Sequence, residues 1–178
     1  MWDIDTLTSP VHRIGDFSFT NQNNQQITNA DFAGKIYVAN FFFTSCPSIC
    51  PRMTDNLKQV ADQFQTTDEV LFLSHSVMPW VDSVEQLKQF AERHVIRSSQ
   101  WHLVTGPQEV INTLARQSYF VEEEIGLTKD SSEFLHTEHC LLIDRDRRIR
   151  GIYNGTLPLE MERLAADIRT LLIEVRPL

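Results

Sequence analysis

The sequence predicts a single α/β domain in which helices cover both faces of a mixed β-sheet. Segments 36–43 (IYVANFFF) and 70–77 (VLFLSHSV) are almost continuously apolar, which is typical of central strands buried on both faces. Each is followed by a stretch with apolar residues at helical spacing. Strand–helix alternation of this kind implies right-handed crossovers between parallel strands. The chain of 178 residues is long enough for one such domain with its own core.

The first half of the chain supplies a hairpin and two strand–helix units. Alternating apolar residues in 16–20, a polar run and then Ile27 predict a short N-terminal β-hairpin added to the core fold. The helix after the first central strand is predicted from the spacing of Met53, Leu57, Val60, Ala61 and Phe64. The helix after the second is predicted from Val84, Leu87, Phe90, Ala91 and Val95.

The second half begins with a third strand, 101–105, and a third helix with Pro107 near its first turn. Segment 121–139 is acidic and lacks a steady period, so we expect a long loop, and long loops in compact domains tend to be functional. Two short strands around RDRR predict an antiparallel hairpin. The closing helix is predicted from Leu164, Ala165, Ile168, Leu172 and Val175.

Composition excludes several classes of protein. Twenty-four acidic residues against sixteen basic ones give a net charge of −8 with no Lys/Arg cluster, so we expect no nucleic-acid partner. No apolar run approaches the ~20 residues that a membrane-spanning helix needs. The first ten residues lack the features of a secretory signal. Either the protein is cytoplasmic, or a leader has been removed from an N-terminal extension, residues 1–15, that precedes the domain at 16–178.

Cys46 and Cys50 lie between the first central strand and its helix, in FFFTSCPSIC. A thiol at a helix N-terminus faces unpaired backbone N–H groups, which stabilise the thiolate. Residues four apart lie on one helix face, close enough for a disulfide or for shared metal ligation. The redox motif of thioredoxins has two residues between its cysteines, whereas this pair has three. A third group must decide between redox and metal chemistry.

Six histidines are candidates for that group. We expect three of them to be surface or packed residues, namely His12, His94 and His102. His75, near the end of the second central strand, could face the cysteines or be a satisfied polar residue. His136 and His139 flank the long loop and the start of a late strand, and whether His136 contributes to a site stays open.

By analogy, the order of elements fits a thioredoxin-like domain. In that fold the loop before the late strand passes beside the cysteine loop, and here it carries His139. Two thiolates and an imidazole form a Cys₂His set, a soft environment suited to Cu(I), whereas structural zinc wants a fourth ligand. Cys140 should point away from His139, because neighbouring side chains of a strand alternate between faces. We therefore expect Cys140 to be a buried apolar residue.

These motifs carry a family resemblance. The stretch GKIYVANFFFTSCPSICPRM, followed much later by TEHCLLID, resembles the SCO/SenC family, which comprises thioredoxin-fold copper-binding proteins that help assemble the dinuclear copper centre of cytochrome c oxidase. The likeness runs from about Phe17 to the closing helix. It implies that Cys46, Cys50 and His139 bind copper, as Cu(I) and also as Cu(II). It further implies an extracytoplasmic location, an N-terminal membrane anchor and cytochrome c oxidase subunit II as the copper acceptor.

The chain also departs from the family pattern. Met78 replaces the first aspartate of a motif usually written S-V-D-P-x-x-D-T, while Asp82 and Ser83 keep the rest of it. RDRR replaces an Asp-Pro-Asp-Gly turn, and Cys140 replaces Ser or Thr. None of these changes removes a ligand. A thioether at Met78 could add a weak ligand, although methionine more often fills gaps.

Three functions remain open at this stage. The first is a copper-delivery or assembly factor, a metal-binding protein rather than a turnover enzyme, with the long loop letting His139 approach the thiolates. The second is a thiol–disulfide oxidoreductase that reduces a copper acceptor, with Cys46 attacking and Cys50 resolving. A peroxidase, with Thr44 and Arg52 activating one thiolate, is the weakest of the three.

Overall fold

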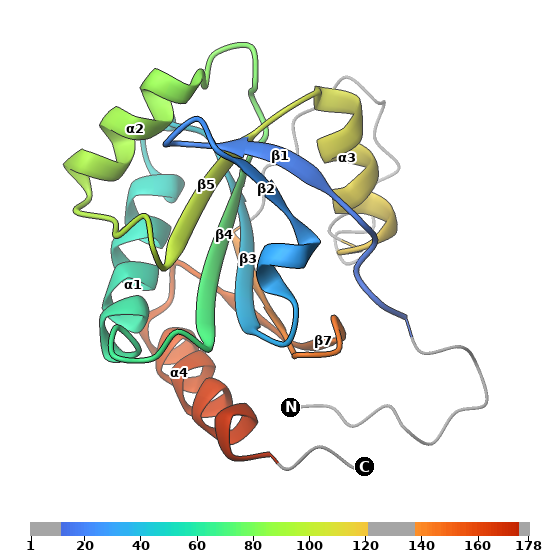
Figure 1. The fold of residues 1–178 in the computed structure, drawn as a ribbon. Helices are drawn as coiled ribbons and strands as arrows, with labels where there is room; N and C mark the ends of the chain where they lie inside the picture. The colour runs from blue at the N-terminus through green and yellow to red at the C-terminus, as the bar shows by residue number, and fades with distance from the viewer. Residues whose placement is uncertain (1–11, 121–137, 175–178) are drawn as a thin grey trace.

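The computed structural model describes residues 12–120 and 138–174, and Figure 1 shows their arrangement. The strands are β1 (Ser18–Asn21), β2 (Gln26–Thr28), β3 (Ile36–Phe42), β4 (Val70–Ser76), β5 (Trp101–Thr105), β6 (His139–Ile143) and β7 (Ile149–Asn154). The helices are α1 (Ile49–Gln63), α2 (Val84–Arg93), α3 (Gln108–Gln117) and α4 (Pro158–Ile173), with a short 3₁₀ helix, η1 (Asn29–Phe32).

These strands form one mixed sheet in the order β2-β1-β5-β4-β3-β6-β7. The three central strands β3, β4 and β5 run parallel, as the strand–helix alternation predicts. β6 and β7 add antiparallel strands on one side, and the N-terminal hairpin β1–β2 adds them on the other. The predicted thioredoxin-like mixed sheet with an added hairpin is therefore confirmed.

Helices cover both faces of the sheet, and each face has its own core layer. Helices α1, α2 and α4 lie together over one face, and α3 lies over the other (Figure 1). In β3, Val38 packs into the layer under α1, whereas Ala39 packs into the layer under α3. This alternation explains why both central strands are buried along their whole length.

One sequence expectation about a helix end is wrong. Val95 does not line α2, because the helix ends at Arg93 and Val95 is 71% exposed with φ 54°. In α4, Leu172 packs against the core as expected, and its neighbour Leu171 is more deeply buried. Of the predicted long loop, 121–137 lies outside the described residues, as do His136 and Val175.

The N-terminal segment packs on the domain before β1 begins. Ile14 is buried, and its N–H donates to the Arg147 carbonyl at 2.9 Å. The residues from 12 onward thus belong structurally with the sheet. Within the described parts of the chain, no helix is long and apolar enough to cross a bilayer.

Candidate metal centre

Cys46 and Cys50 lie close together, Cys46 in the connection after β3 and Cys50 at the start of α1. Cys50 is in the first turn of the helix, and its N–H donates to Cys46 Sγ at 3.4 Å. Both residues are buried, at 5% and 3% exposure, in the core layer under α1. The three cysteines of the chain, including Cys140, are all described and are thiols rather than disulfides. The structure thus brings the predicted pair together in its reduced form.

The two thiols differ in acidity because they face the helix end differently. Burial opposes ionisation of Cys46, but the N–H groups of Ser48, Cys50 and Ile49 outweigh it, so the pKa of Cys46 is lowered. Burial raises the pKa of Cys50 to about 12, and the Cys46 sulfur and the Asp82 carboxylate add to the increase. Cys46 is therefore the thiol that ionises first.

His139 is the first residue of β6, the antiparallel neighbour of β3. Asn40 pairs with Cys140 in this ladder, so His139 lies beside the carboxyl end of β3, where the cysteine segment begins. Cys140 packs in the same layer as the cysteine pair and Leu141 in the opposite one. Strand alternation therefore directs the His139 side chain away from the side of Cys140. His139 is half-buried.

Within residues 12–120 and 138–174, no three His, Cys, Asp or Glu side chains are grouped closely enough to hold a metal ion. The structure thus places the two thiols side by side. The third predicted ligand, His139, lies at the same end of the sheet, with its side chain directed to the other face. The participation of His139 in one site with Cys46 and Cys50 stays a prediction.

The other predicted candidates lie elsewhere. His75 is fully buried on the face opposite the cysteine pair, among Phe17, Phe19, Phe41 and Tyr119, and burial lowers its pKa to about 3. Neither ring nitrogen of His75 has a hydrogen-bond partner among the described residues. Met78 is half-buried and packs against that same opposite layer. Neither residue joins the cysteine pair here.

Three histidines are surface or packed residues, as expected. His12 Nε2 is 2.7 Å from the Ser118 carbonyl oxygen. His94 pairs with Asp55 at 3.0 Å. His102 packs edge-on against Phe32. Cys140 is completely buried, and its Sγ packs close to Gly155. The expectation that Cys140 is a core residue is therefore confirmed.

Asp82 is a buried carboxylate beside the site whose role the sequence did not reveal. It is 0% exposed and accepts hydrogen bonds from the hydroxyls of Thr44 and Ser76, both at 2.5 Å. The Thr44 hydroxyl is thus committed to Asp82, and Arg52 is exposed, so nothing here favours the peroxidase arrangement. In the sequence, Asp82 stood out only as a retained position of the family motif, which did not indicate its hydrogen-bond partners.

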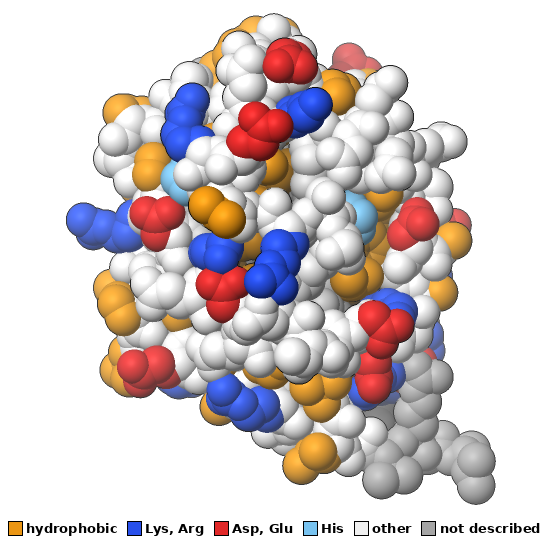
Figure 2. All heavy atoms as spheres, turned by 60° about the vertical axis from the view of Figure 1, so that its left-hand side comes forward, with side chains coloured by type: hydrophobic (Ala, Val, Ile, Leu, Met, Phe, Trp, Pro, Cys, Tyr) orange, Lys and Arg blue, Asp and Glu red, His pale blue; other side chains and the backbone are white. Residues whose placement is uncertain are grey.

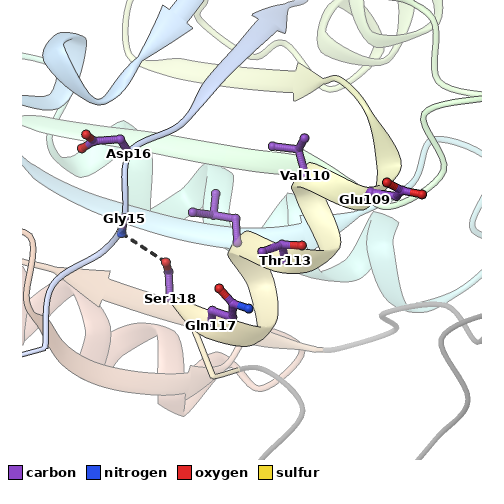
Figure 3. A pocket seen from close by; sticks show the side chains of 8 residues that line it. Gly15, Asp16, Glu109, Val110, Thr113, Gln117 and Ser118 are labelled. Atoms are coloured by element: carbon purple, nitrogen blue, oxygen red, sulfur yellow. Dashed lines mark hydrogen bonds between the residues drawn. The ribbon is translucent and has the colours of Figure 1, made fainter.

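A pocket of about 430 Å³ lies on the other side of the sheet, between the N-terminal segment and α3 (Figure 3). Asp16, Glu109 and Thr113 line it, and the Gly15 N–H donates to Ser118 Oγ at 3.1 Å. Neither the cysteines nor His139 line this pocket. On the face shown in Figure 2, acidic and basic side chains are interspersed rather than segregated.

Comparison with known proteins identifies the family. The family model described as SCO1/SenC matches residues 6–173, nearly the whole chain. The chain belongs to the SCO1/SenC family. A SCO1/SenC family lipoprotein from Bacillus anthracis has 28% sequence identity and a TM-score of 0.78, with 94% of this chain and 99% of that one covered. This confirms the family resemblance that the cysteine and histidine motifs carry.

Two further Sco structures share the fold. BsSco, described as having a disulfide switch and as a member of the Sco family of cytochrome c oxidase assembly proteins, has 24% identity and a TM-score of 0.76, over 94% of this chain and 99% of that one. ScoI of Arabidopsis thaliana, solved with copper bound, has 23% identity and a TM-score of 0.67, over 88% and 98%. SCO1/SenC members with this fold thus include a copper-bound protein.

Proposed function

We propose that this SCO1/SenC protein binds copper through Cys46, Cys50 and His139 and delivers it during assembly of cytochrome c oxidase. The observation that carries the proposal is the pair of buried thiols at the start of α1, with Cys46 Sγ accepting the Cys50 N–H. Thiolates are soft ligands that select Cu(I), and a helix N-terminus favours the ionised form. Family membership and the copper-bound Arabidopsis ScoI support the choice of metal.

His139 completes the proposed set as a neutral nitrogen ligand. It starts the strand next to β3. Strand alternation directs its side chain away from the layer of Cys140 and the thiols, so copper binding requires the imidazole to turn toward the sulfurs at the beginning of β6. Because only thiolates bind, loading releases protons and requires the reduced pair. The proposed acceptor is cytochrome c oxidase subunit II. The proposed location is extracytoplasmic, with membrane attachment through an N-terminal anchor, as the Bacillus anthracis lipoprotein suggests.

A second candidate, a thiol–disulfide oxidoreductase, is favoured by the unequal acidity of the thiols. The Cys46 thiolate would attack a disulfide in the acceptor and release one acceptor thiolate, which takes up a proton. Cys50 would then lose its proton and attack Cys46, releasing the second acceptor thiolate. The acceptor gains two electrons, and this chain ends with a Cys46–Cys50 disulfide.

Anaerobic Cu(I) titration of the reduced protein tests the proposal. We expect one tightly bound copper per chain in the native protein and its loss in Cys46→Ser and Cys50→Ser. His139→Ala should weaken copper binding while leaving the dithiol–disulfide equilibrium unchanged. His94→Ala, which removes a histidine paired with Asp55 away from the site, is the matched control. Copper binding that is unchanged in His139→Ala would instead support the oxidoreductase.

A further inference from the structure

The Asp82 carboxylate lies in the turn between β4 and α2 and receives three hydrogen-bond donors. The Thr44 N–H lies 3.2 Å from each of its oxygens, and the Thr44 and Ser76 hydroxyls donate at 2.5 Å. A carboxylate only accepts hydrogen bonds, so this set of donors matches it fully. Charge-assisted bonds of this kind are shorter and stronger than neutral ones. This completely buried acid therefore links two segments of the chain, one at Thr44 and one at Ser76.

The first of these segments, at Thr44, leads into the cysteine pair. Thr44 lies two residues before Cys46, in the connection between the end of β3 and the start of α1. Ser76 is the last residue of β4 and pairs with Phe42, the last residue of β3. Asp82 thus joins the ends of two central strands to the segment from which Cys46 projects. The Cys46 N–H also donates to the Phe43 carbonyl at 3.3 Å, so the connection is held at both Thr44 and Cys46.

We propose that Asp82 is a positioning residue for the cysteine pair, holding the Thr44–Cys46 segment in the shape in which both sulfurs can act on one metal ion or on each other. For copper this inference rests on the proposed function, whereas for disulfide formation it does not. Partners that orient metal ligands typically contribute 10–100-fold to metal affinity. We expect loss of the Asp82 carboxylate to weaken Cu(I) binding by about tenfold or more.

The test compares four variants in two assays. Asp82→Ala removes all three accepted bonds, Asp82→Asn keeps the shape without the charge, and Thr44→Val keeps the N–H but loses the hydroxyl. Asp144→Asn is the matched control, because Asp144 is another buried carboxylate, bound by Arg148 and Arg150. It follows the end of β6 remote from His139. Thermal unfolding of each variant measures the purely structural cost.

The first assay is Cu(I) affinity by competition with a chromophoric chelator. The second uses the metal-free protein and oxidised glutathione: the two thiols lose two electrons and two protons to form the disulfide, and two molecules of reduced glutathione are produced. We expect Asp82→Ala to lower the Cu(I) affinity about tenfold. The equilibrium constant for disulfide formation should fall as well, and Asp82→Asn should restore part of each loss. Thr44→Val should follow in the same direction. Asp144→Asn should lower the unfolding temperature and leave both constants unchanged.

Equal loss of stability in Asp82→Ala and Asp144→Asn, with both constants unchanged, would overturn the inference. If Asp82→Ala does not fold, an unchanged pair of constants in Thr44→Val overturns it equally. Should the native protein bind no copper at the pair, the proposed function fails. The glutathione equilibrium then still decides whether Asp82 positions the two sulfurs.

Discussion

The sharpest chemical consequence of this geometry is unequal reactivity of two thiols that are four residues apart. Burial raises the pKa of Cys50 to about 12, whereas the N–H groups at the start of α1 lower the pKa of Cys46 below that of an ordinary thiol. Near pH 7.5 an ordinary thiol of pKa about 8.5 is about 10% ionised, whereas a thiol of pKa about 12 is about 0.003% ionised. The thiolate of higher pKa is intrinsically the better nucleophile, which offsets about 40-fold of that ratio of about 3,000. We therefore expect alkylation to prefer Cys46 over Cys50 by about 50-fold or more.

The assay is alkylation of the reduced, metal-free protein with sub-stoichiometric iodoacetamide, followed by peptide mapping. We expect label on Cys46, almost none on Cys50, and none on Cys140, whose pKa is raised by complete burial. Denatured protein, in which all three thiols lose these surroundings, should be labelled evenly and is the control. Equal labelling of Cys46 and Cys50 in the folded protein would refute the argument from the helix N-terminus.

Three predictions concern stability. Burial lowers the pKa of His75 from 6.5 to about 3, so its ring is neutral in the folded protein. Below pH 6.5 the unfolded chain binds a proton that the folded protein does not, and stability is therefore lost as the pH falls from 6.5 toward 3. Urea unfolding should show that His75→Leu removes about 2 kcal/mol of the loss between pH 7.5 and pH 5, and an unchanged pH dependence would contradict this. Gly155→Ala should destabilise the fold by about 1–3 kcal/mol, because the added Cβ would lie 2.6 Å from Met53 Cγ. Thermal unfolding measures this loss, and an unchanged unfolding temperature would contradict the predicted steric clash. Val95→Gly should raise the free energy of unfolding by about 1 kcal/mol, because Val95 has φ 54° just past the end of α2; a less stable variant in urea would refute the strain.

The sequence was sufficient for the layers of the fold but not for the ends of its elements. Continuous apolar runs predicted β3 and β4 because both faces of these strands are covered, and periodicity then placed α1. Val95 was misplaced because it continues the helical spacing of α2. In the structure it instead takes the left-handed backbone position that closes the helix, with the Ile96 N–H donating to the Ala91 carbonyl at 2.8 Å. Apolar spacing cannot detect such a closure when glycine is absent.

The cysteine pair was also predictable, because strand, short connection and helix follow one another in the chain. The contribution of Asp82 was not, since its partners Thr44 and Ser76 lie 38 and 6 residues away and only the pairing of β3 with β4 brings them together. The side to which His75 points depends on the register of β4, which sequence alone left open. In the structure that register places it among aromatic rings away from the thiols.

The proposed function requires Cys46, Cys50 and His139 to bind the same copper ion. X-ray absorption on the anaerobic Cu(I)-loaded protein tests it directly, because the scattering distinguishes sulfur from nitrogen neighbours. We expect two sulfur neighbours and one nitrogen neighbour per copper in the native protein, and loss of the nitrogen neighbour in His139→Ala. A native spectrum with two sulfurs alone, or one that His139→Ala leaves unaltered, would contradict it.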